Sequence, residues 1–195
     1  KSFGGKFYIT PAVQKELIER PINVRRFEFE ALQVLKLIKE GIIEVYNKVP
    51  QQRAAQLESL ANSSFKIDDK TIDVVQSGEL ESVACALELG AAAVVMDERT
   101  LRLFIENSSE MVHLLEGRFN KKVISDTTKI KQFAQLFSNL TIVRSVELIG
   151  VTYRMGLLDS FIPDKNFVPN QKQGKEILLD SVLWAAKYNG CAVTE

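Results

Sequence analysis

The chain has 195 residues, the size of one domain or of one domain with an extension, since domains run to roughly 100–200 residues. Apolar residues make up 46% of it, which excludes wholesale disorder, and 25 basic and 25 acidic residues leave no net charge. A strongly basic body, the usual signature of a tight duplex-DNA binder, is thereby excluded, while a local basic groove is not.

Two cysteines, Cys85 and Cys191, lie in or beside apolar segments and are predicted to be buried thiols. The longest uncharged apolar run, 90–96, is far shorter than the ~20 residues that cross a bilayer. Residues 1–10 lack the apolar stretch of a signal peptide. We therefore expect a cytoplasmic protein without a membrane partner.

The first half of the chain alternates strands with amphipathic helices. Aromatic and β-branched residues predict a strand over 6–10, and Thr10 followed by Pro11 is typical of a helix start. The elements predicted in this half are strand 6–10, helices 11–20 and 24–40, strand 42–46 and helix 50–62. The pattern over 68–76 is ambiguous.

The second half opens with a strong helix over 77–90, closed by Gly90. The apolar run 92–96 follows and predicts an interior parallel strand covered by helices on both faces. The elements predicted after it are helix 98–106, strand 121–125, helix 126–137, strand 140–143, helix 145–159, a loop over 159–171 and helix 172–188. Strands that alternate with helices predict an α/β fold with a parallel sheet.

The motifs that the sequence lacks narrow the chemistry. The single histidine, His113, cannot build a histidine-rich zinc site, and the sequence holds no P-loop, dinucleotide-binding glycine motif or nucleophile elbow. What remains is carboxylates close to the carboxyl ends of strands, where open parallel sheets bind ligands. These carboxylates belong to Glu16, Glu79, Glu81, Asp97 and Glu98.

Converging carboxylates bind Mg²⁺ or Mn²⁺, which can activate water and stabilise charge on a phosphate. Glu79 and Glu81 both lie in the first turns of helix 77–90, but two residues are about 200° apart on a helix, so only one of them can face a shared site. A carboxylate at a helix N-terminus also has an ordinary role, because it complements the helix dipole.

Three segments, in this order, resemble PIN-domain proteins, above all the prokaryotic group that contains VapC-type toxins. They are YITPAVQKELIE at 8–19, SGELESVACALELGAAAVVMDERTLR at 77–102 and VELIGVTYRMGLLD at 146–159. The resemblance implies a three-layer α/β sandwich with a central parallel sheet over residues 1–158. A C-terminal loop and helix, 159–195, would pack on this core.

The resemblance further implies a Mg²⁺- or Mn²⁺-dependent ribonuclease that acts on single-stranded RNA. The family's acidic residues fall on Glu16, on Glu81 with Glu79 as the close alternative, and on Asp97 with Glu98 beside it. The family's first acid ends a strand that precedes 6–10 and has no counterpart here. Because the sequence does not begin with Met, we expect that strand upstream; without it, metal binding and catalysis are in doubt.

Two other interpretations stay open. One is a non-catalytic PIN-like module that binds RNA or a protein, and the other is an unrelated enzyme such as a phosphatase, although the paired aspartates of that chemistry are missing after residue 96. Arg99 and Arg102 follow Asp97 and either meet phosphates or lie on a solvated helix face. By analogy with the family, an antitoxin-like protein and a second copy of the chain are the candidate protein partners.

Overall fold

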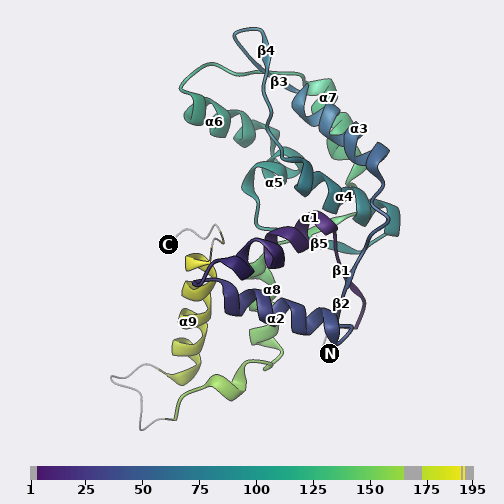
Figure 1. Ribbon diagram of the computed structural model, residues 1–195. Helices are drawn as coiled ribbons and strands as arrows, with labels where there is room; N and C mark the ends of the chain where they lie inside the picture. Colours follow the sequence, from purple (N-terminus) through teal and green to yellow (C-terminus); the bar gives the residue numbers. More distant parts are fainter. Residues whose placement is uncertain (1–3, 165–172, 190, 192–195) are drawn as a thin grey trace.

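The computed structural model describes residues 4–164, 173–189 and 191. Within them, helices alternate with short strands (Figure 1). The helices and helical turns are α1 (Pro11–Gln14), η1 (Lys15–Glu19), η2 (Pro21–Asn23), α2 (Glu28–Lys39), α3 (Gln51–Asn62), α4 (Ser77–Leu89), α5 (Arg99–Glu106), α6 (Ser108–Phe119), α7 (Thr127–Leu136), α8 (Ser145–Arg154), η3 (Asp159–Phe161) and α9 (Gly174–Tyr188). The strands are β1 (Phe7–Ile9), β2 (Ile43–Val45), β3 (Phe65–Ile67), β4 (Lys70–Thr71), β5 (Ala93–Val95), β6 (Ile124–Ser125) and β7 (Thr141–Val143).

The N-terminal parallel pair, β1 and β2, forms as its sequence predicts. The hydroxyl of Thr10 accepts the N–H of Val13 at 3.3 Å and so caps α1, and Pro11 occupies the first helical position. The helix continues through η1, and α2 then returns the chain to β2. Gly41, with φ +67°, ends α2 in the left-handed conformation that glycine adopts without a steric cost.

A hairpin, β3–β4, occupies a region where the sequence pattern was ambiguous. Asp68 and Asp69 have φ values of 49° and 63°, the geometry of a two-residue hairpin turn. β6 pairs with the other edge of β3, and both pairings are antiparallel. The strand predicted at 121–125 therefore exists in part, as β6, but its predicted membership of a parallel sheet is wrong. Helix α6 was not predicted at all.

β5 is an exposed strand, although its sequence predicts an interior one. It pairs in parallel with β7, and among the described strands none pairs with its other edge. Ala93 is exposed and Val95 is 50% exposed, so the prediction that helices cover both faces of 92–96 is wrong. An apolar run indicates that a strand is able to lie in the interior of a sheet. Whether it does so depends on the strands and helices that pack around it.

The described strands thus make two parallel pairs and one three-stranded antiparallel sheet. The predicted mixed α/β class and the parallel pairing of short strands are confirmed. The described residues do not form a single central sheet between two helical layers.

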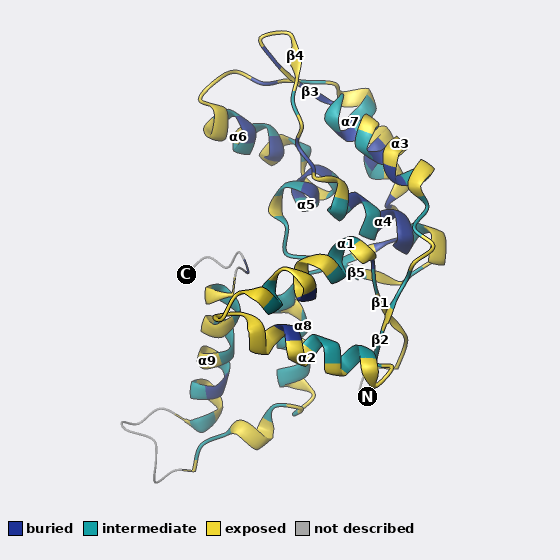
Figure 2. Ribbon diagram, viewed as in Figure 1, coloured by how far each residue is buried: buried dark blue, intermediate teal, exposed yellow. Residues whose placement is uncertain are grey.

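The hydrophobic core lies within residues 54–140. Figure 2 shows buried segments where α3, α4, α5 and α7 meet. Four phenylalanine rings contact one another through this core. The centroid of the Phe104 ring lies 5.2 Å from that of Phe65, in an edge-to-face pair, and 4.3 Å from that of Phe133, in a stacked pair. The Phe133 and Phe137 centroids are 4.8 Å apart. The core therefore belongs to the helices around the antiparallel sheet, and not to the two parallel pairs.

The C-terminal helices α8 and α9 pack against each other. The hydroxyl of Tyr153 in α8 donates to the carbonyl of Lys175 in α9 at 3.2 Å. Residues 165–172, which include most of the predicted loop and the predicted start of the last helix, lie outside the described residues. No helix of the described chain is long and apolar enough to cross a membrane.

Candidate carboxylate site

The first turn of α4 lies against α1 and η1. Gly78 marks the contact: a Cβ built on it would lie 3.6 Å from the Cβ of Ala12 and 4.0 Å from Oε1 of Glu16, which are ordinary van der Waals distances. Glu79, the next residue, accepts the N–H of Gln76 at 3.4 Å and so closes the helix start. The packing of the two helices therefore brings the carboxylate of Glu16 near enough to act on the charge of Glu79.

Two other carboxylates act on Glu79 there. Burial first, and then the negative charges of Glu98 and Glu16, together raise the pKa of Glu79 to about 7 against the lowering effect of the Gln76 N–H. Glu98 lies just before α5 and caps it, accepting the N–H of Leu101 at 2.5 Å. We call Glu16, Glu79 and Glu98 the carboxylate site.

Glu81 lies on another side of α4. Burial raises the pKa of the Cys85 thiol to about 11, and the charges of Glu81 and Glu88 contribute. Glu81 therefore shares a face with Cys85 and Glu88, about 200° away from Glu79. Of the two candidates in this helix, Glu79 lies near Glu16 and Glu81 does not. The resemblance to PIN-domain proteins favoured Glu81. The sequence alone does not reveal which side of α4 packs against α1, and that packing decides between the two carboxylates.

Asp97 has a separate set of partners. Its carboxylate accepts the N–H of Ser145 at 2.9 Å, the hydroxyl of Ser145 at 2.5 Å and the thiol of Cys191 at 3.3 Å. Burial by itself would raise the pKa of Asp97, but these hydrogen bonds and the charge of Arg144 hold it below its ordinary value. Asp97 thus stays ionised and ties the end of β5 to the start of α8.

The partners of Asp97 were missed at the sequence level, although a signal existed. Ser145 follows β7 at the position where Asp97 follows β5, and the two strands are parallel neighbours. Residues that follow neighbouring parallel strands meet at one edge. Cys191 had no such signal; its burial, like that of Cys85, is as predicted.

The two arginines after Asp97 have partners inside the protein. Arg99 lies 3.9 Å from Glu110, and Arg102 lies 3.2 Å from Glu106. The side chain of Arg102 is 19% exposed, and its Nε is buried without a hydrogen-bond partner in the described structure. Its charge also lowers the pKa of Glu147, after the larger effects of the Arg144 backbone N–H and side chain. Contact of either arginine with phosphate stays a prediction.

The described residues contain no group of three or more carboxylate, imidazole or thiol side chains that could enclose a metal ion by themselves. Mg²⁺, however, usually keeps several waters and takes one or two carboxylates together with substrate phosphates. The carboxylate site offers that number of oxygen ligands, and the pKa of Glu79 is raised there first by burial and then by the charges of Glu98 and Glu16. Binding of a hydrated Mg²⁺ or Mn²⁺ by these carboxylates stays a prediction.

Comparisons with known proteins add no relative: no family model, no curated protein and no solved structure matches this chain. Function must therefore be argued from the residues and their geometry.

Proposed function

We propose that this protein is a Mg²⁺- or Mn²⁺-dependent hydrolase of phosphodiester bonds in single-stranded RNA, and that the carboxylate site is its centre. The observation that carries the proposal is Glu79, a carboxyl whose pKa is about 7 because it is partly buried beside Glu98 and Glu16. Such perturbed carboxyls concentrate at functional sites. A divalent cation there would relieve the repulsion that burial enforces.

Each residue of the site has a specific role in this proposal. Glu79, with Glu16 or Glu98, would hold the cation through carboxylate oxygens, and the remaining ligands would be waters and a phosphate oxygen of the substrate. When bound, such a cation lowers the pKa of a bound water and neutralises charge on the phosphate. Glu79, whose pKa is near neutrality without a cation, would release its proton when the cation binds, because carboxylate ligands bind in their ionised form.

Asp97 acts next to this site as a positioning residue in our proposal. It precedes Glu98, and its hydrogen bonds to Ser145 fix the backbone from which Glu98 extends. The direct metal-binding role that the resemblance assigns to Asp97 requires it to exchange those partners. The proposal therefore places cation binding first on Glu79.

The open strand edges support the family resemblance. In the described structure, β1 pairs only with β2 and β5 pairs only with β7. Phe7 is 41% exposed and Val95 is 50% exposed on these strands. The resemblance implies one more parallel strand that ends in an acid, and such a strand would cover apolar edges of this kind and add a carboxylate.

A second exposed apolar surface, on and before α2, is compatible with binding of a protein partner. Large exposed apolar side chains lie on α2 and in the turn before it, with exposed fractions between 43% and 68%; they are Val24, Phe27, Phe29 and Leu32. Patches of this kind mark interaction sites. We propose that a second copy of the chain or an antitoxin-like protein binds there in the cytoplasm, which size-exclusion chromatography at several concentrations tests.

The alternative function is a non-catalytic module that binds RNA or a protein. One observation favours it: Asp97 is engaged in three hydrogen bonds, so one of the acids expected in a nuclease centre is already occupied. The two proposals differ in whether bound RNA is cut.

The test is cleavage of a panel of labelled single-stranded RNAs with Mg²⁺ or Mn²⁺, with EDTA as the negative control. We expect Glu79→Gln to reduce the rate by about 100-fold, which corresponds to about 2.7 kcal/mol of transition-state stabilisation. Glu81→Gln is the matched control, because it alters the same helix on another face and should keep the rate. Mn²⁺ binding followed by electron paramagnetic resonance gives a second readout that needs no turnover.

Metal-dependent cleavage that survives Glu79→Gln would contradict the assigned centre. RNA binding without cleavage, by a folded protein with bound Mn²⁺, would instead support the binding module.

A further inference from the structure

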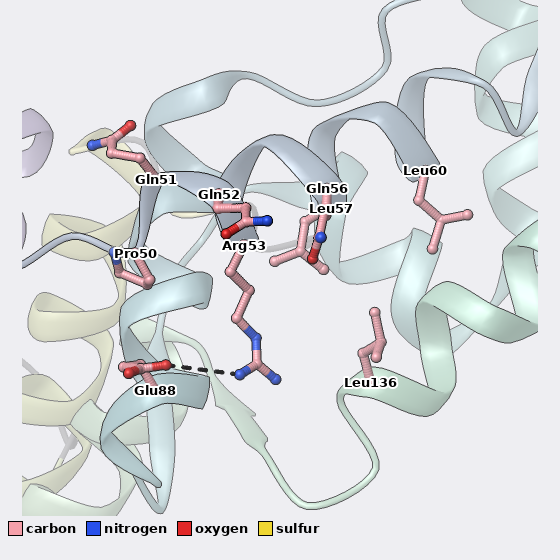
Figure 3. A pocket seen from close by; sticks show the side chains of 9 residues that line it. All are labelled: Pro50, Gln51, Gln52, Arg53, Gln56, Leu57, Leu60, Glu88 and Leu136. Atoms are coloured by element: carbon pink, nitrogen blue, oxygen red, sulfur yellow. Dashed lines mark ion pairs between the residues drawn. The ribbon is translucent and has the colours of Figure 1, made fainter.

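A pocket of about 630 Å³ opens between α3, α4 and α7, away from the carboxylate site (Figure 3). Glu88 lines it from α4, nine residues after Glu79, and nine residues correspond to half a turn of rotation. The pocket and the carboxylate site therefore lie on opposite faces of α4. Its volume is in the range of pockets that hold small ligands.

The pocket combines an apolar wall with unused hydrogen-bonding groups. Leu57, Leu60 and Leu136 supply the apolar surface, and Leu136 is 44% exposed. The amides of Gln52 and Gln56 stand at its border, and in the described structure neither has a hydrogen bond to protein. A ligand with an apolar face and a polar edge matches this lining.

Arg53 and Glu88 are the charged groups of the pocket. Figure 3 shows Arg53 extending from α3 toward Glu88, and the closest nitrogen and oxygen are 3.9 Å apart. That separation is too long for a hydrogen bond, and their side chains are 42% and 52% exposed, so the pair itself contributes little stability. The guanidinium donors and the carboxylate acceptors are therefore both available to a ligand.

We propose that this pocket binds a guanine base. Guanine presents two parallel donors, N1–H and N2–H, which match the two oxygens of a carboxylate such as Glu88. Its adjacent edge presents two acceptors, O6 and N7, which match the fork of a guanidinium such as Arg53. Adenine, cytosine and uracil lack this combination of a paired donor edge beside a paired acceptor edge.

The leucine wall completes the complementarity. The flat, apolar face of a purine would pack against Leu60 and Leu136 and so remove apolar surface from water. The ligand is either a free guanine nucleotide or an unpaired guanine in single-stranded RNA, since both present the same edges. The inference does not rest on the proposed hydrolase activity, because it concerns another face of the molecule.

Isothermal titration of the full chain with GMP, IMP and AMP, in EDTA so that no cleavage occurs, tests the proposal. We expect GMP to bind about tenfold or more tightly than AMP, with IMP between them because it lacks the N2 amino group. Glu88→Gln should reduce the preference for GMP over AMP, since an amide has one acceptor atom in place of two and cannot pair with N1–H and N2–H side by side. Arg53→Lys, which keeps the charge but loses the fork, should weaken GMP binding.

Glu58→Gln is the matched control: it lies on α3, outside the pocket lining, and should leave GMP affinity unchanged. Circular dichroism and amide chemical shifts verify that each variant is folded. Short RNAs with or without a central guanine separate the two sources of the base, and tighter binding of the guanine RNA or of GMP supports the pocket. Equal affinity for the nucleotides, a preference that Glu88→Gln leaves undiminished, or absence of binding by every nucleotide and RNA overturns it.

Discussion

Two regions of this molecule are built differently. Residues 50–140, which we call the core region, contain the whole continuous hydrophobic core. The described residues of 4–49 and 141–191, which we call the flanking region, contain only scattered buried side chains: Thr10, Ile18, Ala31, Leu178 and Cys191. Figure 2 shows the same contrast between dark blue segments above and helices below that are mostly intermediate or exposed. The core region folds by burial, whereas the flanking region depends on a few specific contacts.

The carboxylate site lies where these regions meet. Glu79 and Glu98 belong to the core region, and Glu16 belongs to the flanking region. The close approach of Gly78 to Ala12 and the hydrogen bonds from Ser145 to Asp97 hold the two regions together. A site at such a junction can be assembled or lost without unfolding the core. Substitutions can therefore test the core region and the flanking region separately.

The largest expected effect is on the core region. Phe104 is fully buried between Phe65 and Phe133, so Phe104→Ala removes ring contacts and leaves a cavity. We expect the free energy of unfolding to fall by about 3–5 kcal/mol, measured by urea denaturation. A loss below about 1 kcal/mol would show that this region is not the main source of stability.

The next effect concerns the hydrogen bonds that join the regions. Asp97→Asn should lower stability at neutral pH by about 1–2 kcal/mol, because an amide accepts fewer of the three donors and carries no charge. The pKa of Asp97 is lower in the folded state than in the unfolded state. Its ionised carboxylate therefore stabilises the fold above its ordinary pKa, and this stabilisation is lost as the pH falls through the folded-state pKa. Ser145→Ala should be non-additive with Asp97→Asn in a double-mutant cycle. Additivity would mean that the two residues act separately.

The third effect is the pH dependence produced by Glu79. Its pKa is raised from 4.5 to about 7, so the folded state binds more protons than the unfolded state in that interval, and stability should fall as pH rises through it. Glu79→Gln should remove that slope and stabilise the protein above pH 7 by about 1 kcal/mol, after allowance for solvent screening. Glu81→Gln is the control and should keep the slope. Thermal melts at several pH values measure both; a stability difference between wild type and Glu79→Gln that does not vary with pH would contradict the proposed repulsion.

The smallest effect is expected in the flanking region. Phe29 on α2 is 68% exposed, so Phe29→Ala should change the free energy of unfolding by less than about 0.5 kcal/mol. The same substitution, Phe to Ala, is thus expected to lower the free energy of unfolding strongly at Phe104 in the core region and hardly at Phe29 in the flanking region. A large loss at Phe29 would indicate that α2 is covered in solution, and analytical ultracentrifugation would then identify the oligomer.

Local signals in the sequence determined much of the secondary structure. The Thr10 cap, the proline at Pro11 and the glycines that end α2 and α4 fixed helix boundaries, because their backbone preferences act within a few residues. Asp126, where the sequence predicts the start of a helix, likewise caps α7 by accepting the N–H groups of Thr128 and Lys129. The hairpin at Asp68 and Asp69 escaped prediction because positive φ at residues other than glycine is uncommon and depends on the surrounding strands.

The candidate site was determined only in part. The sequence identified the acidic residues that surround it, since they follow strands or open helices. It did not decide between Glu79 and Glu81, which differ by about 200° around α4, because that choice depends on where α1 packs. Likewise, the sequence marked Asp97 as a ligand, whereas the packing of α8 and the position of Cys191 engage it in hydrogen bonds.

By itself, then, the sequence determined most of the helices and strands, the α/β class and the acidic residues that are candidates for a site, because caps, periodicity and residue type act locally. Only the tertiary structure decided that β5 stays exposed, that β6 pairs antiparallel with β3, and that Glu79 lies within reach of the charge of Glu16. The physical reason is that burial, strand partners and the shift of a pKa are properties of neighbours distant in the chain, and an amphipathic or apolar pattern does not specify which neighbours those are.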